Sequence, residues 1–413
     1  MGRFGEQENP PPRWRRAAPA AQKRVEGKPQ TAPQETIGKE KMGLLSDLND
    51  ERLTKTILRL LEENYDLGKL TRVKEVIGGF CNKSYAVWMS TNDHVHRYFL
   101  RLYNPDVIEN EILFEHALLK HLRSNGFTFA AAIIPCRNHT TVVFSPPPEN
   151  HQGRRSLWAL FEFLEGEDKY SWTQTILTDK EYISAAEILA RFHHCGHGFK
   201  KPPGADRAQP PIMEFMPTFK NTFSTFREQA GDRRCDRLFK DNFKPICKAL
   251  DYAASFDVRF QGMPEIPIHG DYHPGNLKFC HEKGVGILDF DWSKIDYRLF
   301  DLALGLVYFT SVWNDQAAGL RPDKFSLFLS TYNQACHRLA HISPLTKREQ
   351  RYLVPILSIA NLYVLNWDLV DYYDTPEPDD DEYYMFINHN IGLIHWIANH
   401  EDELVKLGSC LDL

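Results

Sequence analysis

The chain has 413 residues, 42% of them apolar and 25% charged, with a formal net charge of −6. This is the composition of an ordinary globular protein, and the length allows roughly two to three domains. The charge is spread along the chain, which excludes DNA or RNA as the main partner. The longest apolar runs, around 302–313 and 353–365, fall short of the ~20 residues that span a bilayer. We therefore expect buried helices and no membrane partner.

The eight cysteines are scattered, with no C-x-x-C pair. This spacing favours reduced thiols in a cytoplasmic protein over disulfides or a zinc ribbon. Residues 1–42 are rich in Pro, Gln, Ala and Arg and have almost no apolar periodicity. We expect this tail to be disordered.

The first ordered elements predicted are one helix and a sheet. Leu53, Ile57 and Leu60 recur at helical spacing, with Ser46 and Asp47 nearby as possible N-caps. The stretch 71–103 then alternates between short apolar runs and turn residues, which predicts an antiparallel sheet.

A helix over residues 107–126 should follow, and it carries Glu115 on its apolar face. A carboxylate in that position either reaches water at the edge of the stripe or pairs with a cation, because an unpaired buried carboxylate is costly. Arg101, in the strand just before this helix, is the obvious partner. Both interpretations of Glu115 stay open.

Next we expect a second strand pair at 130–134 and 141–144, then an apolar strand that breaks at Gly166. This break marks a predicted boundary between a small lobe, residues 43–165, and a large lobe, residues 166–413. Apart from one stretch, the large lobe has helical patterns. The sequence therefore predicts an α+β fold with an antiparallel-sheet N-lobe and a mainly helical C-lobe.

The exception is IHGDYHPGNLKFC at 268–280, followed by GVGILDFDW at 284–292. Two short apolar strands around a glycine-ended loop predict a hairpin. If Cys280 lies opposite Val285, Asn276 lies opposite Asp289, with Cβ atoms roughly 5 Å apart. An amide oxygen and a carboxylate at that spacing can share a hard cation such as Mg²⁺.

The pattern HGDYHPGN at 269–276, followed by ILDFD at 287–291, resembles the phosphotransferase family that includes aminoglycoside phosphotransferases, choline kinases and type II homoserine kinases. The similarity runs from about Leu70 to Trp313. It implies a bilobed protein kinase-like fold. It further implies an enzyme that moves the γ-phosphate of ATP, with Mg²⁺, to a hydroxyl of a small molecule such as an amino alcohol or amino sugar.

The resemblance also implies catalytic roles. Asp271 would orient and deprotonate the acceptor hydroxyl, and Asn276 and Asp289 would hold Mg²⁺ on the ATP phosphates. Asp291 would support a second ion or the loop. We expect His269 and the second histidine of the turn to brace it through hydrogen bonds, since the aspartate already supplies the base.

A second implied set binds the nucleotide and comes from a glycine turn, an ion pair and a hinge: Gly78, Gly79, Arg101, Glu115, Glu162 and Leu164. The glycines would form the phosphate loop, and the hinge backbone would meet the adenine. Two features depart from the family pattern. Many relatives have lysine at the position of the arginine, and the two glycines are adjacent rather than spaced as G-x-G-x-x-G.

Two other features are open to more than one interpretation. His193 and His197 stand four residues apart, yet no third metal ligand stands beside them, so we favour a supporting helix over a metal site. The stretch 366–384 is either a solvated acidic loop or part of a pocket for an amine-bearing alcohol. That pocket would be lined by Trp313, Asp315, Trp367, Asp368, Asp371 and Tyr372.

Three functions are compatible with these patterns. The first is a small-molecule kinase, favoured by the complete set of Asp271, Asn276 and Asp289. The second is a protein serine/threonine kinase of the same family, although no activation-loop segment follows Asp291. The third is a nucleotide-binding regulator without catalysis. The sequence predicts neither the acceptor nor the oligomeric state.

Overall fold

The protein is described by a computed structural model that covers residues 45–48, 50–76, 82–92, 94–145, 155–256, 262–313 and 318–409. It divides into two compact units: Met1–Glu109 with Pro135–Leu160, and Asn110–Ile134 with Phe161–Leu413. The tail predicted for residues 1–42 lies outside the described residues.

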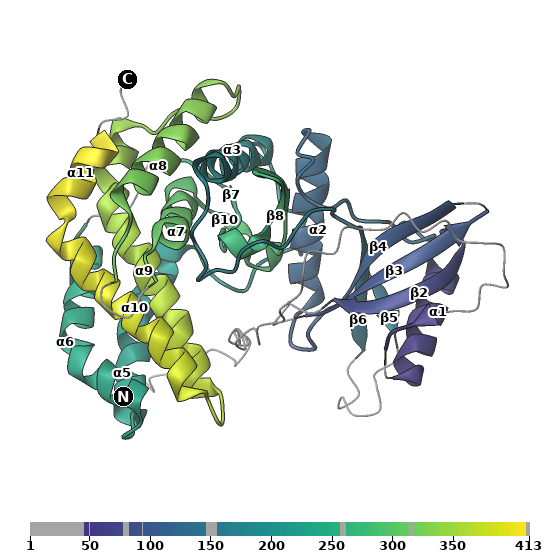
Figure 1. The fold of residues 1–413 in the computed structure, drawn as a ribbon, viewed down its shortest axis with the longest axis horizontal. Helices are drawn as coiled ribbons and strands as arrows, with labels where there is room; N and C mark the ends of the chain where they lie inside the picture. Colours follow the sequence, from purple (N-terminus) through teal and green to yellow (C-terminus); the bar gives the residue numbers. More distant parts are fainter. Residues whose placement is uncertain are drawn as a thin grey trace, which may run out of the picture. The chain divides into compact units, whose positions relative to one another are not determined.

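The first unit is built on a six-stranded sheet with the order β1-β2-β3-β4-β6-β5 (Figure 1). Its strands are β1 Leu45–Ser46, β2 Lys69–Val76, β3 Lys83–Thr91, β4 His94–Leu102, β5 Val143–Ser145 and β6 Ser156–Glu162. β1 runs parallel to β2, whereas β2–β3, β3–β4 and β5–β6 are antiparallel pairs. The predicted antiparallel sheet is confirmed.

The helix α1, Glu51–Asn64, packs its buried face against β2 and β5 (Figure 1). Its N-cap is Asp50, whose carboxylate accepts hydrogen bonds from the backbone N–H groups of Arg52 and Leu53 at 2.9 and 3.1 Å. The predicted caps, Ser46 and Asp47, were wrong. Asp47 instead accepts from Arg72 at 3.0 Å, because the helix begins at Glu51, three residues too far along the chain for Asp47 to cap it.

The second predicted strand pair is also corrected. Residues 130–134 form no strand; one isolated bridge joins Ile133 to Phe161. β5 pairs instead with β6, where Val143 lies opposite Trp158. The backbone N–H of Glu162 donates to Ala132 at 2.8 Å, so this segment contacts only the end of β6 and cannot extend the ladder.

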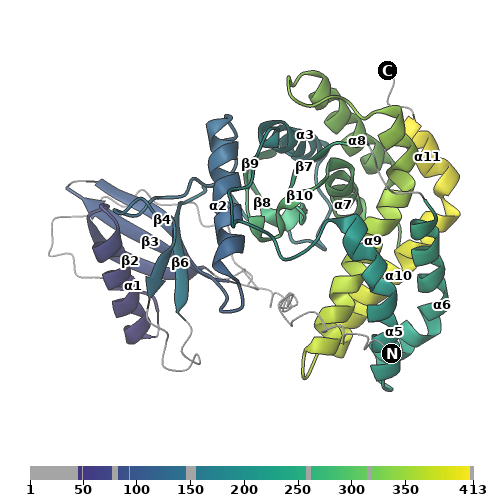
Figure 2. The same ribbon diagram turned by 180° about the vertical axis from the view of Figure 1, so that it is seen from behind.

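The second unit is mainly helical, as predicted. Its helices are α2 Glu109–Ser124, α3 Asp179–Gly196, α4 Ile212–Phe215, α5 Phe219–Gln229, α6 Arg234–Ser255, α7 Arg298–Thr310, α8 Pro322–His337, α9 Lys347–Asp374, α10 Asp380–Asn399 and α11 Glu401–Ser409. All the residues of α7 are buried. α9 packs against α5, α6, α7, α10 and α11 (Figure 2).

α9 begins with a capping box between Thr346 and Glu349. Within the described ranges it is the one helix long and apolar enough to cross a membrane, but 94% of its most apolar 18-residue window is buried inside the protein. Its hydropathy is that of a central core helix.

Two small sheets interrupt the helices. β7 Glu265–Ile268 pairs antiparallel with β10 Lys294–Tyr297, and β8 Leu277–Cys280 pairs antiparallel with β9 Lys283–Ile287. Short 3₁₀ helices, Met216–Thr218, Pro274–Asn276 and Phe290–Trp292, complete the unit.

The predicted register of the β8–β9 hairpin was wrong. Cys280 lies opposite Lys283, and Leu277 lies opposite Ile287, with a register shift between Lys278 and Phe279. The turn is therefore shorter than expected, and Val285 is the extra residue of a bulge. Opposite Asn276 stands Leu288, whose backbone N–H donates to the asparagine carbonyl at 2.8 Å.

Candidate active site

A turn at residues 269–276 connects β7 to β8 and contains the predicted catalytic residues; we call it the catalytic turn. Lys294 of β10 lies opposite Ile268, immediately before this turn. Gly270 has a φ of 76°. A Cβ added there would lie 2.5 Å from the carbonyl oxygen of Trp292, so only glycine allows the turn to approach this closely.

Asp301, in the first turn of α7, anchors the catalytic turn. Its carboxylate is fully buried and accepts hydrogen bonds from the backbone N–H groups of His269 and Gly270, at 2.8 and 2.9 Å. It accepts another from Nε2 of His193 at 3.0 Å. Two amides just before Asp271 are thus tied to a buried helix, which fixes where Asp271 stands.

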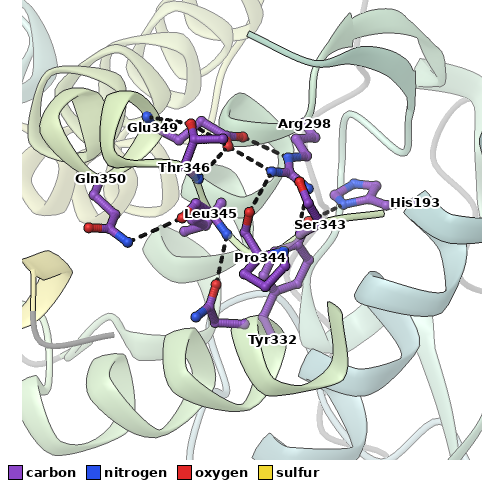
Figure 3. Close-up of polar contacts among 10 residues, drawn as sticks. His193, Arg298, Tyr332, Ser343, Pro344, Leu345, Thr346, Glu349 and Gln350 are labelled. Carbon is purple, nitrogen blue, oxygen red and sulfur yellow. Dashed lines mark hydrogen bonds and ion pairs between the residues drawn. The ribbon is translucent and has the colours of Figure 1, made fainter. Parts of the chain in front are cut away.

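His193 joins Asp301 to Tyr332 of α8; Figure 3 shows His193 and Tyr332. Because Nε2 donates to Asp301, Nδ1 accepts from the Tyr332 hydroxyl, at 2.8 Å. Burial lowers the pKa of His193 despite the neighbouring carboxylate, so the ring is neutral. Burial alone would raise the pKa of Asp301, but the hydrogen bonds that its carboxylate accepts from His193 and from the backbone of the turn outweigh burial and lower that pKa.

A buried ion pair fixes the start of α7 (Figure 3). The Arg298 guanidinium donates to both carboxylate oxygens of Glu349, at 2.6 and 2.7 Å, and to the carbonyl of Ser343 at 2.7 Å. Glu349 also accepts from the backbone N–H of Thr346 at 2.9 Å. The helix that carries Asp301 is therefore held to the start of α9.

His269 makes the bracing hydrogen bonds expected of it. Its Nδ1 accepts from the backbone N–H of Asp271 at 3.3 Å, and its Nε2 donates to the carbonyl of Leu288 at 2.9 Å. Burial lowers the pKa of His269, which keeps the ring neutral. This ring links the catalytic turn to the end of the β8–β9 hairpin.

Asp271 and Asn276 face one another across the catalytic turn. Nδ2 of Asn276 donates to the carbonyl of Asp271 at 2.8 Å and to its carboxylate at 3.3 Å. Nε2 of His273 lies 3.5 Å from the same carboxylate oxygen. Oδ1 of Asn276 accepts no hydrogen bond within the part of the chain that the structure describes. This leaves the amide oxygen available to a ligand.

Asp289 and Asp291 follow β9 directly. Asp289 adopts a left-handed conformation, with φ 62° and ψ 72°, just before the Phe290–Trp292 helix. Arg207 holds this segment by donating to the carbonyls of Phe290 and Ser293, at 2.8 and 2.7 Å. Asp289 follows Leu288, which lies opposite Asn276, so it belongs to the turn after the ladder and does not pair with Asn276 in the ladder as predicted.

The predicted hinge lies at the end of β6. The carboxylate of Glu162 accepts from the backbone N–H of Ala132 at 3.3 Å and pairs with Arg123 at 3.3 Å. The backbone N–H of Leu164 has no hydrogen-bond partner among residues with described coordinates. A free amide in that position can donate to a ligand.

Other predicted nucleotide-binding residues are not brought together here. Gly78 and Gly79 lie outside the described residues. Arg101 stands on β4 in the first unit. Glu115 is buried on α2 in the second unit, which removes the interpretation that it reaches water. The pairing of Arg101 with Glu115 stays a prediction.

The acidic stretch 366–384 is solvent-exposed only in part, mainly around residues 374–377 between α9 and α10. Trp367, Asp368, Asp371 and Tyr372 are buried within α9. Nδ2 of Asn390 on α10 donates to Asp368 at 2.7 Å. Asp315 of the same predicted pocket lies outside the described residues.

Sequence reasoning missed Asp301 and Tyr332. A signal for Asp301 existed, because an acid in an otherwise apolar helix must find donors. His193 and His197 do not act as a pair: His193 binds Asp301, whereas His197 stacks on His341 with ring centroids 5.5 Å apart. No group of three or more His, Cys, Asp or Glu side chains in the described segments is placed to hold a metal ion.

The fold and site define a small-molecule kinase, a phosphotransferase with an alcohol group as acceptor. A family model described as "Phosphotransferase enzyme family" matches residues 72–332. The chain belongs to this phosphotransferase family.

Relatives and solved structures agree with this assignment. A homoserine kinase of Bradyrhizobium sp. (strain ORS 278) is 25% identical over 315 residues, covering 76% of this chain and 84% of the relative. A microcompartment-associated aminopropanol kinase shares the fold with a TM-score of 0.62 at 16% identity, covering 86% of this chain and 99% of its own. A spectinomycin phosphotransferase in complex with ADP and spectinomycin has a TM-score of 0.57 at 15% identity, with 87% and 98% covered.

Proposed function

We propose that this kinase transfers the γ-phosphate of ATP to the hydroxyl of a small amino alcohol. The observation that carries the proposal is the catalytic turn, in which Asp271 is held in place by Asn276 and by the amides tied to Asp301. Phosphoryl transfer depends mainly on positioning and charge neutralisation. A fixed carboxylate is suited to orient an acceptor hydroxyl.

Asp271 is the proposed base. It would accept the proton of the acceptor hydroxyl as the oxygen attacks the γ-phosphorus atom and the bond to the β-phosphate oxygen breaks. The neutral ring of His269 donates to a backbone carbonyl and does not compete for this proton. His273, next to the carboxylate, would orient it.

Asn276 and Asp289 are the proposed Mg²⁺ ligands, with Asp291 as a further support. The residues fit this group. Nδ2 of Asn276 donates to Asp271. Oδ1 accepts no hydrogen bond from the described residues, so it can bind a cation. Amide and carboxylate oxygens are the ligands that Mg²⁺ prefers, and it is usually held by one or two such groups plus phosphates. When bound, the ion would neutralise the phosphate charge.

The adenine of the nucleotide would lie at the hinge. The free N–H of Leu164 supports adenine binding there, with Glu162 fixed by Arg123 beside it. Gly78, Gly79, Arg101 and Glu115 remain proposed on the resemblance alone. A relative of the same fold was solved with ADP, which supports a nucleotide as the phosphate donor.

The amine of the acceptor is proposed from the residues of α9. Asp368 and Asp371 place two carboxylates in the helical unit, and burial together with these carboxylates and Glu382 raises the pKa of the nearby Tyr383. An ammonium group is the ligand that such a region favours. Two similar proteins, a homoserine kinase and an aminopropanol kinase, have names that describe amino alcohol acceptors.

Two alternatives have less support. A protein kinase needs an activation segment, but β10 and α7 follow Phe290–Trp292 directly. A regulator without catalysis would not need Asp271, Asn276 and Asp289 together. We also propose a cytoplasmic location, on the unpaired cysteines of the described residues.

The proposal is tested by ADP release with ATP and Mg²⁺ against amino alcohols, neutral sugars and a generic protein substrate. We expect an amino alcohol to stimulate turnover, and Asp271→Asn to lower kcat by about 10²–10⁴-fold with ATP affinity retained. Stimulation only by neutral sugars would remove the amino alcohol, and stimulation only by protein would favour the protein kinase. Full activity of Asp271→Asn would remove the assigned base.

A further inference from the structure

An aromatic cluster lies beside the catalytic turn in the same unit. Tyr308 of α7 packs on His273 with ring centroids 5.4 Å apart and on Trp172 at 6.4 Å. A Cβ added at Gly275, inside the turn, would lie 3.3 Å from the carbonyl carbon of Ser171. The segment that carries Trp172 therefore touches the turn that holds Asp271.

Trp172 and Trp313 are half-buried members of this cluster. Their rings meet edge to face at 5.2 Å, and Trp172 also contacts Phe386 of α10 at 4.5 Å. His389, one turn further along α10, stacks on Trp313 at 3.7 Å. Three stretches far apart in sequence, around residues 172, 313 and 386–389, thus converge on one place.

The segment of Trp172 is held firmly. Thr175 accepts hydrogen bonds at its hydroxyl from Arg321, at 2.8 Å, and at its carbonyl from the Tyr182 hydroxyl, at 2.7 Å. The Thr175 hydroxyl itself donates to the carbonyl of Ser311, close to Trp313. The two tryptophans are therefore positioned before any ligand arrives.

One polar atom of the cluster is unsatisfied. The indole Nε1–H of Trp313 is buried and has no hydrogen-bond partner in the described structure. Buried indole N–H groups usually find an acceptor. The stacked His389 does not provide one, since its Nε2 lies 3.2 Å from the hydroxyl of Ser311 and its ring lies flat against the indole.

We propose that Trp313 determines acceptor specificity, by donating its indole N–H to an oxygen group, such as a carboxylate, that the acceptor carries in addition to its amine and its reacting hydroxyl. This inference rests on the proposed function. Trp172 forms the apolar wall beside that group. A site built to donate a hydrogen bond rejects an analogue that lacks the acceptor oxygen, because the buried donor is then left unpaired.

Two matched substrate pairs test this specificity. L-Homoserine and 3-aminopropan-1-ol differ only by a carboxylate, and so do L-serine and 2-aminoethanol. We expect the wild-type protein to prefer the carboxylate-bearing member of the pair it accepts. Trp313→Phe, which keeps the aromatic ring but removes the N–H, should lower kcat/KM for that member by about tenfold or more and leave its decarboxylated partner within about threefold.

Trp88→Phe, on β3 of the first unit, is the matched control and should leave the preference unchanged. The KM for ATP and the melting temperature should stay at wild-type values in Trp313→Phe, which a general structural defect would not allow. Equal loss on both members of a pair, or no loss on either, overturns the role of Trp313. Equal wild-type activity on both members overturns the selectivity while leaving the amino alcohol kinase in place. No turnover of any of the four compounds overturns the amino alcohol proposal itself, and this inference with it.

Discussion

Replacing Gly270 by alanine tests whether the position of the catalytic turn limits the reaction. The added Cβ would lie 2.5 Å from the carbonyl oxygen of Trp292, whereas ordinary van der Waals contact needs about 3.5 Å. The turn and the Phe290–Trp292 segment must therefore separate by about 1 Å, and a misplacement of that size can slow a reaction about 100-fold. We expect kcat to fall by about that factor, because Asp271 is the next residue.

Gly198→Ala is the matched control. Gly198 has a φ of 74°, close to the 76° of Gly270, but no atom lies within 4 Å of an added Cβ. Both variants should lose about 1–2 kcal/mol of unfolding free energy from the left-handed backbone, and only Gly270→Ala should also lose kcat. Rates are measured by ADP release with the best acceptor, and stability by urea denaturation. A folded Gly270→Ala protein with wild-type kcat would refute the reasoning, as would an equal loss of kcat in Gly198→Ala.

Two further predictions concern buried charge. Arg298→Met should lower the free energy of unfolding by about 3–5 kcal/mol, because it leaves the carboxylate of Glu349 buried without its partner. Measured by urea denaturation, the double variant Arg298→Met/Glu349→Leu should recover much of the lost free energy. A loss below about 1 kcal/mol in the single variant would contradict the prediction. Burial lowers the pKa of His389 to about 4, against about 6.5 in an unfolded chain, so between these values the unfolded chain binds a proton that the folded protein does not. This part of the stability is complete above pH ~6.5 and is lost as the pH falls toward about 4, by up to about 3 kcal/mol. His389→Gln should remove that part of the pH dependence of the unfolding free energy, and parallel curves for variant and wild type would count against it.

The sequence was sufficient to predict the catalytic turn because its parts are local. Asp271 and Asn276 stand five residues apart in a glycine-broken turn, and such a short segment has few ways to separate them. The helical large unit and the antiparallel sheet followed from periodicity in the same way. In each case the pattern and the contact lie within one element or its neighbour.

The support behind the turn could not be predicted in the same way. His193 and Asp301 lie 108 residues apart, and only the packing of α3 against α7 brings them to 3.0 Å. The register of the β8–β9 hairpin failed for a related reason. A bulge at Val285 changes which residues face each other without altering the apolar pattern, so Asn276 meets Leu288 and not Asp289.

The central position of α9 has a consequence for shortened forms of the protein. This apolar helix is covered in part by α10 and α11, which follow it in the chain. The earlier helices α5, α6 and α7 contact other parts of it. A chain that stops near residue 375 would therefore leave part of an apolar, normally buried helix exposed to chaperones, membranes or other chains.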